Sequence, residues 1–190
     1  MYQQERKRRV SSNSYESLEQ FLEGLKMEAT MGEMTHGDLD RVHQLISKTN
    51  QFNLTTRRYT EADLRAMESD PDIATFQVRL ADRFGDNGMI CVVICRANHD
   101  VWEIDSWLMS CRVLGRKVED AVLNELVRAG RAAGKNGLTG IFRDSGRNEL
   151  AHELYPKLGF LFANEEDRET RWRLDFAGYV EHPVPMTVHR

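Results

Sequence analysis

The chain has 190 residues, of which 41% are hydrophobic and 29% are charged, and its formal net charge is −4. This length and balance are typical of one compact globular domain with its own core. The slightly acidic charge argues against a nucleic-acid-binding protein, which is more often basic. No hydrophobic run is long enough to span a membrane, so we expect no membrane partner.

The chain begins with a basic and polar segment. Residues 6–9 are all Lys or Arg, and serines follow them instead of the apolar stretch of a signal peptide. We therefore expect a tail or linker over residues 1–14, a single domain over residues 15–180 and a C-terminal tail over residues 181–190.

The cysteines indicate a reducing compartment. An odd number of three, without a secretory signal, predicts free thiols in the cytoplasm. Cys91 and Cys95 lie four residues apart in an apolar run, so as strand residues they share a buried face. A zinc site would need more ligands at suitable spacing, and the six histidines are scattered, so we expect no metal.

Hydrophobic periodicity predicts an alternation of helices and strands. We expect helices over residues 15–25, from Thr35 onward, after a Thr60 cap, and over 116–133 and 148–158. We expect strands over residues 26–33, 73–82, 89–97, 101–111, 138–142, 159–162 and 170–176. The order predicts an α/β (α+β) fold, with a mixed, mostly antiparallel sheet of about seven strands and helices on both faces.

The strand over residues 101–111 loses its alternation. Trp102 and Ile104 alternate with polar neighbours, but three apolar residues in a row follow Ser106. One extra residue at Ser106–Trp107 would restore the alternation, which is the pattern of a β-bulge. The alternative is a strand end that is buried on both faces.

The turn after this strand, Ser110-Cys-Arg-Val-Leu-Gly-Arg-Lys117, could hold a phosphate. Gly115 allows positive φ and close approach, the following helix offers free N–H groups, and Arg112, Arg116 and Lys117 add positive charge. The alternative is a cationic surface turn without a ligand.

Two carboxylates, Glu103 and Asp105, lie on one face of the same strand, where burial would push their pKa values apart. Either could serve as a general base, and both could instead belong to a solvated face. Cys111, next to Arg112, could be a reactive thiol or a plain core cysteine.

The segment from Asn148 to Phe160, which ends in Tyr-Pro-Lys-Leu-Gly-Phe, resembles the closing half of the GNAT acyltransferase superfamily. The turn Arg-Val-Leu-Gly-Arg-Lys resembles the loop of that superfamily that binds the coenzyme A pyrophosphate, although Lys117 stands where glycine or alanine is usual. The resemblance implies a splayed fourth and fifth strand, with acetyl-CoA or another acyl-CoA held as a phosphopantetheine thioester between them.

The resemblance also implies roles for particular residues. Freed backbone groups of Leu108, Met109 and Ser110 would bond the pantetheine arm, and Tyr155 would protonate the departing thiolate. A tyrosine that only packs its ring under the final strand is the alternative. The cofactor contacts implied by the resemblance also include Arg112, Val113, Gly115, Arg116, Lys117 and Asn148.

Three longer strings resemble the C-terminal domain of FkbH-like proteins, which load a glyceryl unit onto an acyl carrier protein for polyketide extender units. They are residues 48–58, 79–88 and 106–115. The segment Asp144-Ser-Gly-Arg-Asn148 departs from the Pro-Thr-x-Lys-Asn of that family. The aspartate-rich motif of its haloacid-dehalogenase-like half does not occur, so we expect either an excised fragment or a protein without that half.

We therefore expect an acyltransferase, or else a non-catalytic module of the same fold that binds an acyl carrier protein beside a separate glyceryl-loading domain. The loop of residues 50–58 is expected on the acceptor side, where its donors could contact a phosphopantetheine arm or a carrier surface. The candidate acceptor contacts are Asn50, Gln51, Asn53 and Arg57. The alternative is a loop whose amides cap neighbouring helices.

Overall fold

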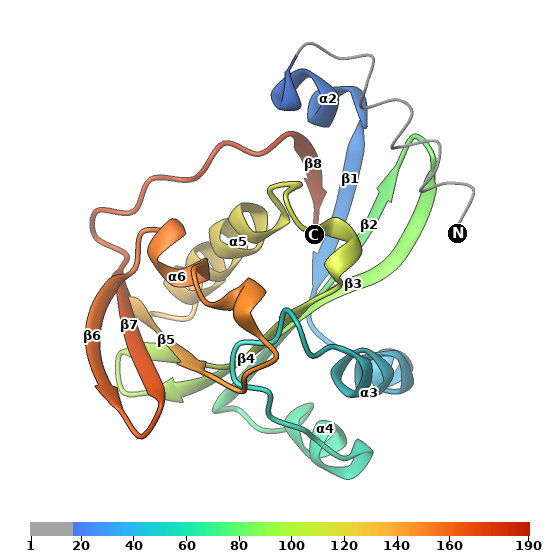
Figure 1. Cartoon of the computed structure of the whole chain (residues 1–190). Coiled ribbons are helices and arrows are strands. Elements are labelled where there is room, and N and C mark those ends of the chain that lie inside the picture. Colours follow the sequence, from blue (N-terminus) through green and yellow to red (C-terminus); the bar gives the residue numbers. More distant parts are fainter. Residues whose placement is uncertain (1–16) are drawn as a thin grey trace.

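The computed structural model describes residues 17–190, so the tail expected over residues 1–14 lies outside the described residues (Figure 1). The helices are α2 (Leu18–Gly24), α3 (Leu39–Lys48), α4 (Glu61–Met67), α5 (Val118–Ala132) and α6 (Leu154–Lys157), with short 3-10 turns at His36–Asp38, Cys111–Val113 and Glu149–Ala151. The strands are β1 (Met27–Gly32), β2 (Ile73–Asp82), β3 (Gly85–Asn98), β4 (Val101–Met109), β5 (Gly137–Arg143), β6 (Leu161–Glu166), β7 (Glu169–Asp175) and β8 (Met186–His189).

The strands form one mixed sheet in the order β6-β7-β5-β4-β3-β2-β1-β8. The pairs β4–β5 and β1–β8 are parallel, and the other neighbours are antiparallel. The predicted fold class is confirmed. The sheet has eight strands where we expected about seven, because residues 186–189, which we expected in the C-terminal tail, form β8 beside β1.

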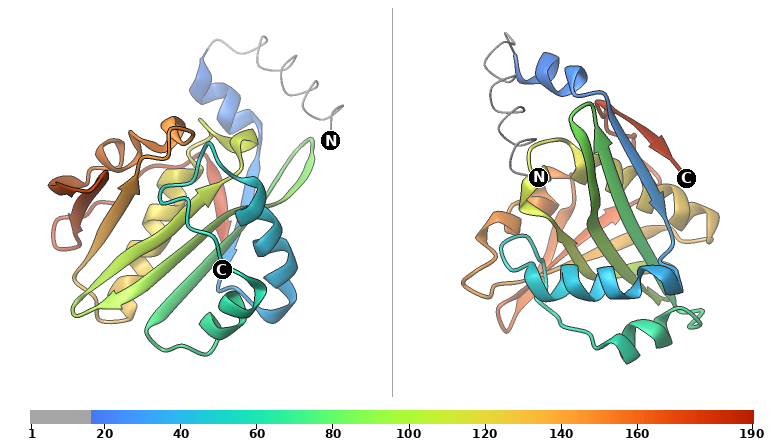
Figure 2. Two further views of the ribbon diagram at one scale, coloured as in Figure 1. Left: turned by 60° about the horizontal axis from the view of Figure 1, so that its bottom comes forward. Right: turned by 90° about the vertical axis from the view of Figure 1, so that its right-hand side faces the viewer.

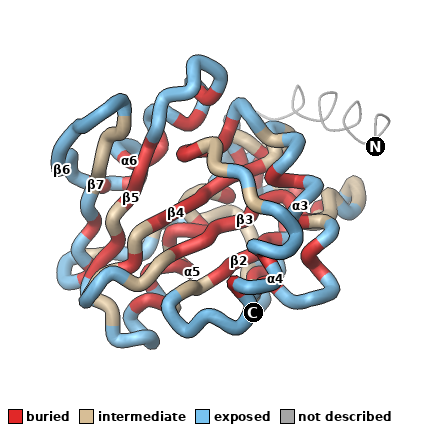
Figure 3. Tube along the Cα trace, turned by 90° about the horizontal axis from the view of Figure 1, so that it is seen from below, coloured by how far each residue is buried: buried red, intermediate tan, exposed pale blue. Residues whose placement is uncertain are grey.

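Helices cover both faces of the sheet, and β3 shows how the sequence produces this. Cys91, Val93 and Cys95 point into a core shared with α2, α5 and α6, whereas Val92 and Ile94 point into a second core shared with α3 and α4. Successive strand residues face opposite sides, so a run of apolar residues fills both cores. The middle of β3, residues 89–95, is accordingly buried, while β6 is exposed (Figure 3).

Two predicted helix boundaries illustrate the local chemistry. Thr60 caps α4 as expected, because its hydroxyl accepts the Asp63 N–H at 3.1 Å while the Asp63 carboxylate accepts the Thr60 N–H at 2.8 Å. The single helix expected over residues 148–158 is instead a 3-10 turn followed by α6. Pro156 explains the break, because it has no N–H to donate and its ring would clash with the carbonyl of His152.

The segment between β7 and β8, residues 176–185, runs across α5 from one edge of the sheet to the other (Figure 1). Asn124 of α5 fixes it: its amide donates to the His182 carbonyl at 2.9 Å and accepts the His182 N–H at 2.9 Å. The His182 ring also contacts the Asp120 carboxylate at 2.7 Å. These bonds bring β8 to the free edge of β1, as the views in Figure 2 show.

Candidate functional site

The bulge expected in β4 is present, one residue earlier than predicted. In the β3–β4 ladder Ile94 lies opposite Ser106 and Cys95 lies opposite Ile104, which leaves Asp105 as the extra residue. A bulge bends its strand and disturbs the local pairing. Here it coincides with the point where β4 leaves its other neighbour.

β4 and β5 separate just beyond the bulge, as we expected. Residues Val101–Ile104 of β4 pair in parallel with residues Gly137–Gly140 of β5. The pairing ends there, although β4 continues to Met109 and β5 continues to Arg143. The sheet is therefore split between the C-terminal halves of these two strands.

The split is filled by residues Phe52–Leu54 of the loop between α3 and α4. The Met109 N–H donates to the Phe52 carbonyl at 3.0 Å, and the Leu54 N–H donates to the Trp107 carbonyl at 3.0 Å. On the other side, the Arg143 N–H at the end of β5 donates to the Leu54 carbonyl at 2.9 Å. The loop thus acts as a short strand between β4 and β5.

This corrects the expectation that Leu108, Met109 and Ser110 offer free backbone groups. Leu108 lies opposite Val92 in the β3–β4 ladder, the Met109 N–H is bonded to Phe52, and the Ser110 N–H donates to the Ile90 carbonyl at 2.7 Å. A ligand could bond the outer edge of β4 only where Phe52–Leu54 withdrew from it.

Asn148, expected as a cofactor contact, holds this loop in place. Its amide nitrogen donates to the carbonyls of Asn53 and Arg143, each at 2.9 Å, and its amide oxygen accepts the Ser145 N–H at 2.9 Å. The side chain is fully buried, so these bonds satisfy an amide that water does not reach.

The turn before α5 has the backbone that we expected of a phosphate loop. Gly115 has φ +74°, an added Cβ there would meet no atom within 4 Å, and Lys117 has φ +64° at the start of α5. The side chains are placed less favourably. Val113 is in the core, and the buried Arg116 pairs with Asp82 at 3.2 Å and donates to the Arg112 carbonyl at 2.8 Å.

Glu119, in the first turn of α5, adds negative charge at the same place. Burial raises the pKa of its carboxyl above the ordinary value of 4.5, and the backbone N–H groups of Glu119 and Gly115 offset this only in part. Because a phosphate beside an ionised Glu119 would be repelled, the turn is less suited to pyrophosphate than its glycine suggests.

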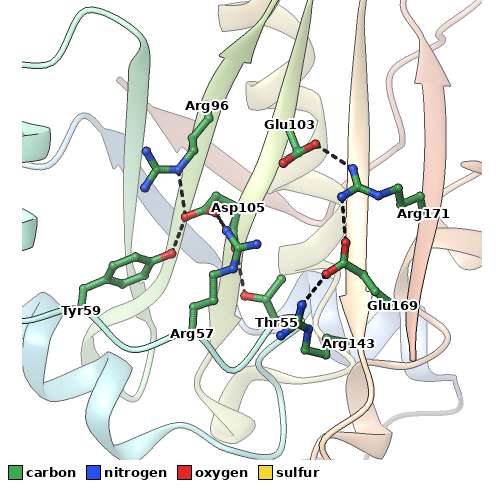
Figure 4. A network of polar contacts seen from close by, with 9 residues as sticks. All are labelled: Thr55, Arg57, Tyr59, Arg96, Glu103, Asp105, Arg143, Glu169 and Arg171. Atoms are coloured by element: carbon green, nitrogen blue, oxygen red, sulfur yellow. Dashed lines mark hydrogen bonds and ion pairs between the residues drawn. The ribbon is translucent and has the colours of Figure 1, made fainter. Parts of the chain in front are cut away.

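The two candidate bases lie in separate polar networks (Figure 4). The Asp105 carboxylate is fully buried and contacts the guanidinium groups of Arg57 and Arg96 and the hydroxyl of Tyr59. Burial raises the pKa of that tyrosine. Thr55 also anchors this loop, since its hydroxyl donates to the Asp105 carbonyl at 2.9 Å.

Glu103 points to the neighbouring strands instead. Its carboxylate accepts a hydrogen bond from Arg171 of β7 at 2.9 Å (Figure 4). Arg171 also pairs with Glu169, and Glu169 in turn pairs with Arg143. The Glu103 side chain is 20% exposed, whereas that of Asp105 is 0% exposed. The expected close pair of carboxylates is therefore divided by the bulge.

Tyr155 is buried with 0% exposure. Its hydroxyl accepts the Ile141 N–H at 3.2 Å and donates to the Ile141 carbonyl at 3.3 Å, and its ring lies on Gly140, where a Cβ would come within 2.4 Å of it. Burial raises the pKa of the phenol well above 10.0. In this arrangement Tyr155 packs beneath β5, and its catalytic role stays a prediction.

Two cavities flank the loop, and Phe52 lines both. The first, the α5 pocket, has a volume of about 610 Å³ and is walled by Leu18, Phe52, Leu114, Gly115, Lys117, Glu119, Asp120, Leu150, Glu153, Leu154, Lys157 and Leu158. The second, the α3 pocket, has a volume of about 470 Å³ and is walled by Arg41, Gln44, Leu45, Lys48, Thr49, Asn50, Gln51, Phe52, Met109, Ser110, Cys111 and Arg112.

Of the expected acceptor contacts, Asn50 and Gln51 line the α3 pocket. Asn53 is buried, and its amide accepts the Thr56 N–H at 2.9 Å, while Arg57 pairs with Asp105. Among residues 17–190 there is no group of three or more His, Cys, Asp or Glu that could hold a metal ion. No helix in the same range is long and apolar enough to cross a membrane.

The sequence analysis missed Arg41 and Lys48, which come from α3. A signal was present, because these residues are seven positions apart and Gln44 lies between them, so all three share one helix face next to buried Leu45. This pattern alone does not indicate a site, because a polar stripe on an exposed helix face usually contacts only solvent.

No known protein family matches the sequence, and no curated protein matches it. Solved structures do match the fold. The ribosomal-protein-S18-alanine N-acetyltransferase from Escherichia coli superposes with a TM-score of 0.59 at 19% identity, over 82% of this chain and 98% of that one. The GNAT domain of S. lividans PAT superposes with a TM-score of 0.60 at 16% identity, over 76% of this chain and 89% of that one.

The spermidine N-acetyltransferase from Vibrio cholerae, solved in complex with CoA and spermine, gives a TM-score of 0.60 at 16% identity, over 78% of this chain and 96% of that one. The chain has the GNAT acetyltransferase fold. The likeness in fold extends over nearly the whole length of each of these structures. The two pockets lie around two features of this fold, the bulge in β4 and the split between β4 and β5.

Proposed function

We propose that the protein is a GNAT-type acyltransferase that binds a pantetheine-type thioester in the α5 pocket and transfers the acyl group to an acceptor. The observation that carries this proposal is the separation of β4 from β5 beyond Ile104. Phe52 connects the split with the pocket, because its backbone is bonded in the split and the residue also lines the pocket.

The lining of the α5 pocket supports a pantetheine arm more than a pyrophosphate. Its apolar wall consists of Leu18, Phe52, Leu114, Leu150, Leu154 and Leu158, which suits a long, weakly polar arm. Its charged residues are Lys117 and Lys157 against Glu119, Asp120 and Glu153, so carboxylates outnumber cations. We therefore favour an acyl-carrier thioester over acyl-CoA as the donor.

Backbone groups of β4 would position the thioester. Where Phe52–Leu54 withdrew, the Met109 N–H and the Trp107 carbonyl would become available to an amide-bearing arm. A fixed N–H aimed at a thioester carbonyl stabilises the negative charge that develops on its oxygen. Glu103 is our candidate base, because its carboxylate is partly exposed while Asp105 is buried among three partners.

The strings that resemble the FkbH-like domain support a role in polyketide extender-unit biosynthesis. On this proposal the partners are an acyl carrier protein and a haloacid-dehalogenase-like glyceryl-loading domain. The acceptor and the acyl group are not specified by these strings.

The test measures binding and turnover separately. Acetyl-CoA, acetyl-pantetheine and an acetylated carrier protein would each be titrated by calorimetry, and thiol release would be followed with the acceptor supplied. We expect the carrier and pantetheine thioesters to bind and to be consumed, and Glu103→Gln to slow consumption without weakening binding. If none of the three thioesters binds, the proposal is wrong.

A second candidate function is a non-catalytic module that binds an acyl carrier protein. The occupied edge of β4 and the buried Tyr155 favour it, because neither is placed to act on a thioester in this conformation. This candidate predicts that the carrier protein binds while no thioester is consumed. Tyr155→Phe would then leave all measured rates at background.

A further inference from the structure

We propose that the α3 pocket binds a small anionic ligand through a phosphate or carboxylate group. Three cations line it, Arg41 and Lys48 from α3 and Arg112 from the turn after β4, and none of its lining residues is acidic. For a chain with a formal net charge of −4, this is a strong local excess of positive charge. Anions are attracted to such a site, and its low-dielectric walls strengthen the attraction.

Two of these cations are available for a ligand. Among residues 17–190, the Lys48 ammonium has no hydrogen bond or ion pair, and Arg41 contacts only the neutral amide of Gln44. The third, Arg112, donates to the Ser110 hydroxyl at 3.1 Å, and both residues line the pocket. The side chains of Asn50 and Gln51 add neutral hydrogen-bonding groups at the rim.

The contrast with the α5 pocket shows that this charge is specific to one side of Phe52. The lining of the α5 pocket has two cations and three carboxylates, whereas that of the α3 pocket has three cations and no carboxylate. A volume of about 470 Å³ suits a small molecule, since ligand pockets usually span roughly 300–1,000 Å³. A polyamine would be repelled here.

The ligand is assigned as the acceptor, and this role rests on the proposed function. Phe52 lines both pockets and is bonded to Met109 at the end of β4. A molecule in the α3 pocket would therefore be separated from a thioester in the α5 pocket by Phe52. The binding of an anion does not depend on that role. It can therefore be measured without any thioester.

Cys111 provides the measurement, because it is the exposed cysteine in the pocket wall and the other two, Cys91 and Cys95, are buried. Alkylation of the folded protein with neutral iodoacetamide would be followed by mass spectrometry in inorganic phosphate, in acetate, and in sodium chloride of equal ionic strength. At a phosphate concentration of about twice Kd the rate should fall about threefold, because only the unoccupied fraction reacts.

Lys48→Gln and Arg41→Gln should each weaken this protection, while Arg65→Gln, an exposed helix cation outside the pocket, should leave it unchanged. The dianionic reagent 5,5′-dithiobis(2-nitrobenzoate) should modify Cys111 severalfold more slowly in Lys48→Gln than in the parent protein, with no matching change for iodoacetamide. Spermidine should give no protection.

Equal protection by sodium chloride, or protection that survives both glutamine substitutions, would overturn the proposal. Protection by 4′-phosphopantetheine but by neither phosphate nor acetate would also overturn it, because it would place the thioester arm itself in the α3 pocket. Failure of the proposed function gives a different result: thioesters do not bind, while phosphate still protects Cys111.

Discussion

Asn148 and Asn53 lie 95 positions apart in the sequence, yet the side-chain amide of Asn148 donates to the main-chain carbonyl of Asn53 at 2.9 Å. The same nitrogen donates to the Arg143 carbonyl at the end of β5. One buried side chain therefore joins the loop that fills the sheet to one of the two strands that it separates. The loop can leave the split only if this amide releases it, together with the main-chain bonds to Trp107, Met109 and Arg143.

We expect Asn148→Ala to lower the free energy of unfolding by about 1–3 kcal/mol, because it leaves the buried Asn53 carbonyl without this partner and also removes the bonds to the Arg143 carbonyl and the Ser145 N–H. Urea denaturation measures the loss. Hydrogen exchange of the Leu54 and Met109 amides should also become faster than the exchange of β3. Asn164→Ala, at an exposed position of β6, is the control and should change neither quantity.

We expect Arg116→Gln to cost about 3–5 kcal/mol of stability, because it removes the cation from a buried ion pair with Asp82. Arg65→Gln breaks an exposed pair with Glu61 and should cost about 0–1 kcal/mol. Denaturant titration of both variants compares the two. Similar losses would mean that Arg116 is a surface cation, as the phosphate-loop interpretation of the sequence implied.

Gly140→Ala should destabilise the protein by about 1–3 kcal/mol or more, since its Cβ would come within 2.4 Å of the Tyr155 ring and force that ring to move. Gly32→Ala in β1, where no atom lies within 4 Å and φ is ordinary, should be neutral. Thermal unfolding of both variants is the measurement. An unchanged melting temperature for Gly140→Ala would show that Tyr155 is not packed on β5 as described.

Glu119→Gln should stabilise the protein at neutral pH and give progressively less stabilisation as the pH falls. The folded pKa of Glu119 is raised above 4.5, so its protonated form favours folding and that contribution is lost as the pH rises through the folded pKa. Glutamine keeps a neutral side chain at every pH. Unfolding free energies between about pH 4 and pH 8 test this, and a gain that grew toward acid would contradict the assignment.

Much of the fold could be predicted because its signals are local. The Thr60–Asp63 capping box, the apolar run of β3 and the broken alternation in β4 each involve residues that are close in the sequence. The same patterns located the bulge to within one residue. The mixed sheet with helices on both faces followed from the order of these elements.

The candidate site was harder to predict because its residues are placed by distant partners. The phosphate-loop pattern could not reveal that Arg116 pairs with Asp82, which lies 34 positions earlier. The depth of Tyr155 depends on the absence of a side chain at Gly140. Residues Phe52–Leu54 stand in a stretch rich in amide and hydroxyl groups, which predicts a loop, and only the split sheet explains why they form strand-like bonds.

β8 was missed for a similar reason, and its position has a consequence for synthesis. Met186 pairs with Met27, about 160 positions earlier, so at typical translation rates of about 5–20 residues per second β1 emerges roughly 8–30 s before its outer neighbour. During that interval one edge of the nascent sheet has unpaired amides and carbonyls. A chaperone that shields strand edges would therefore act on β1 first.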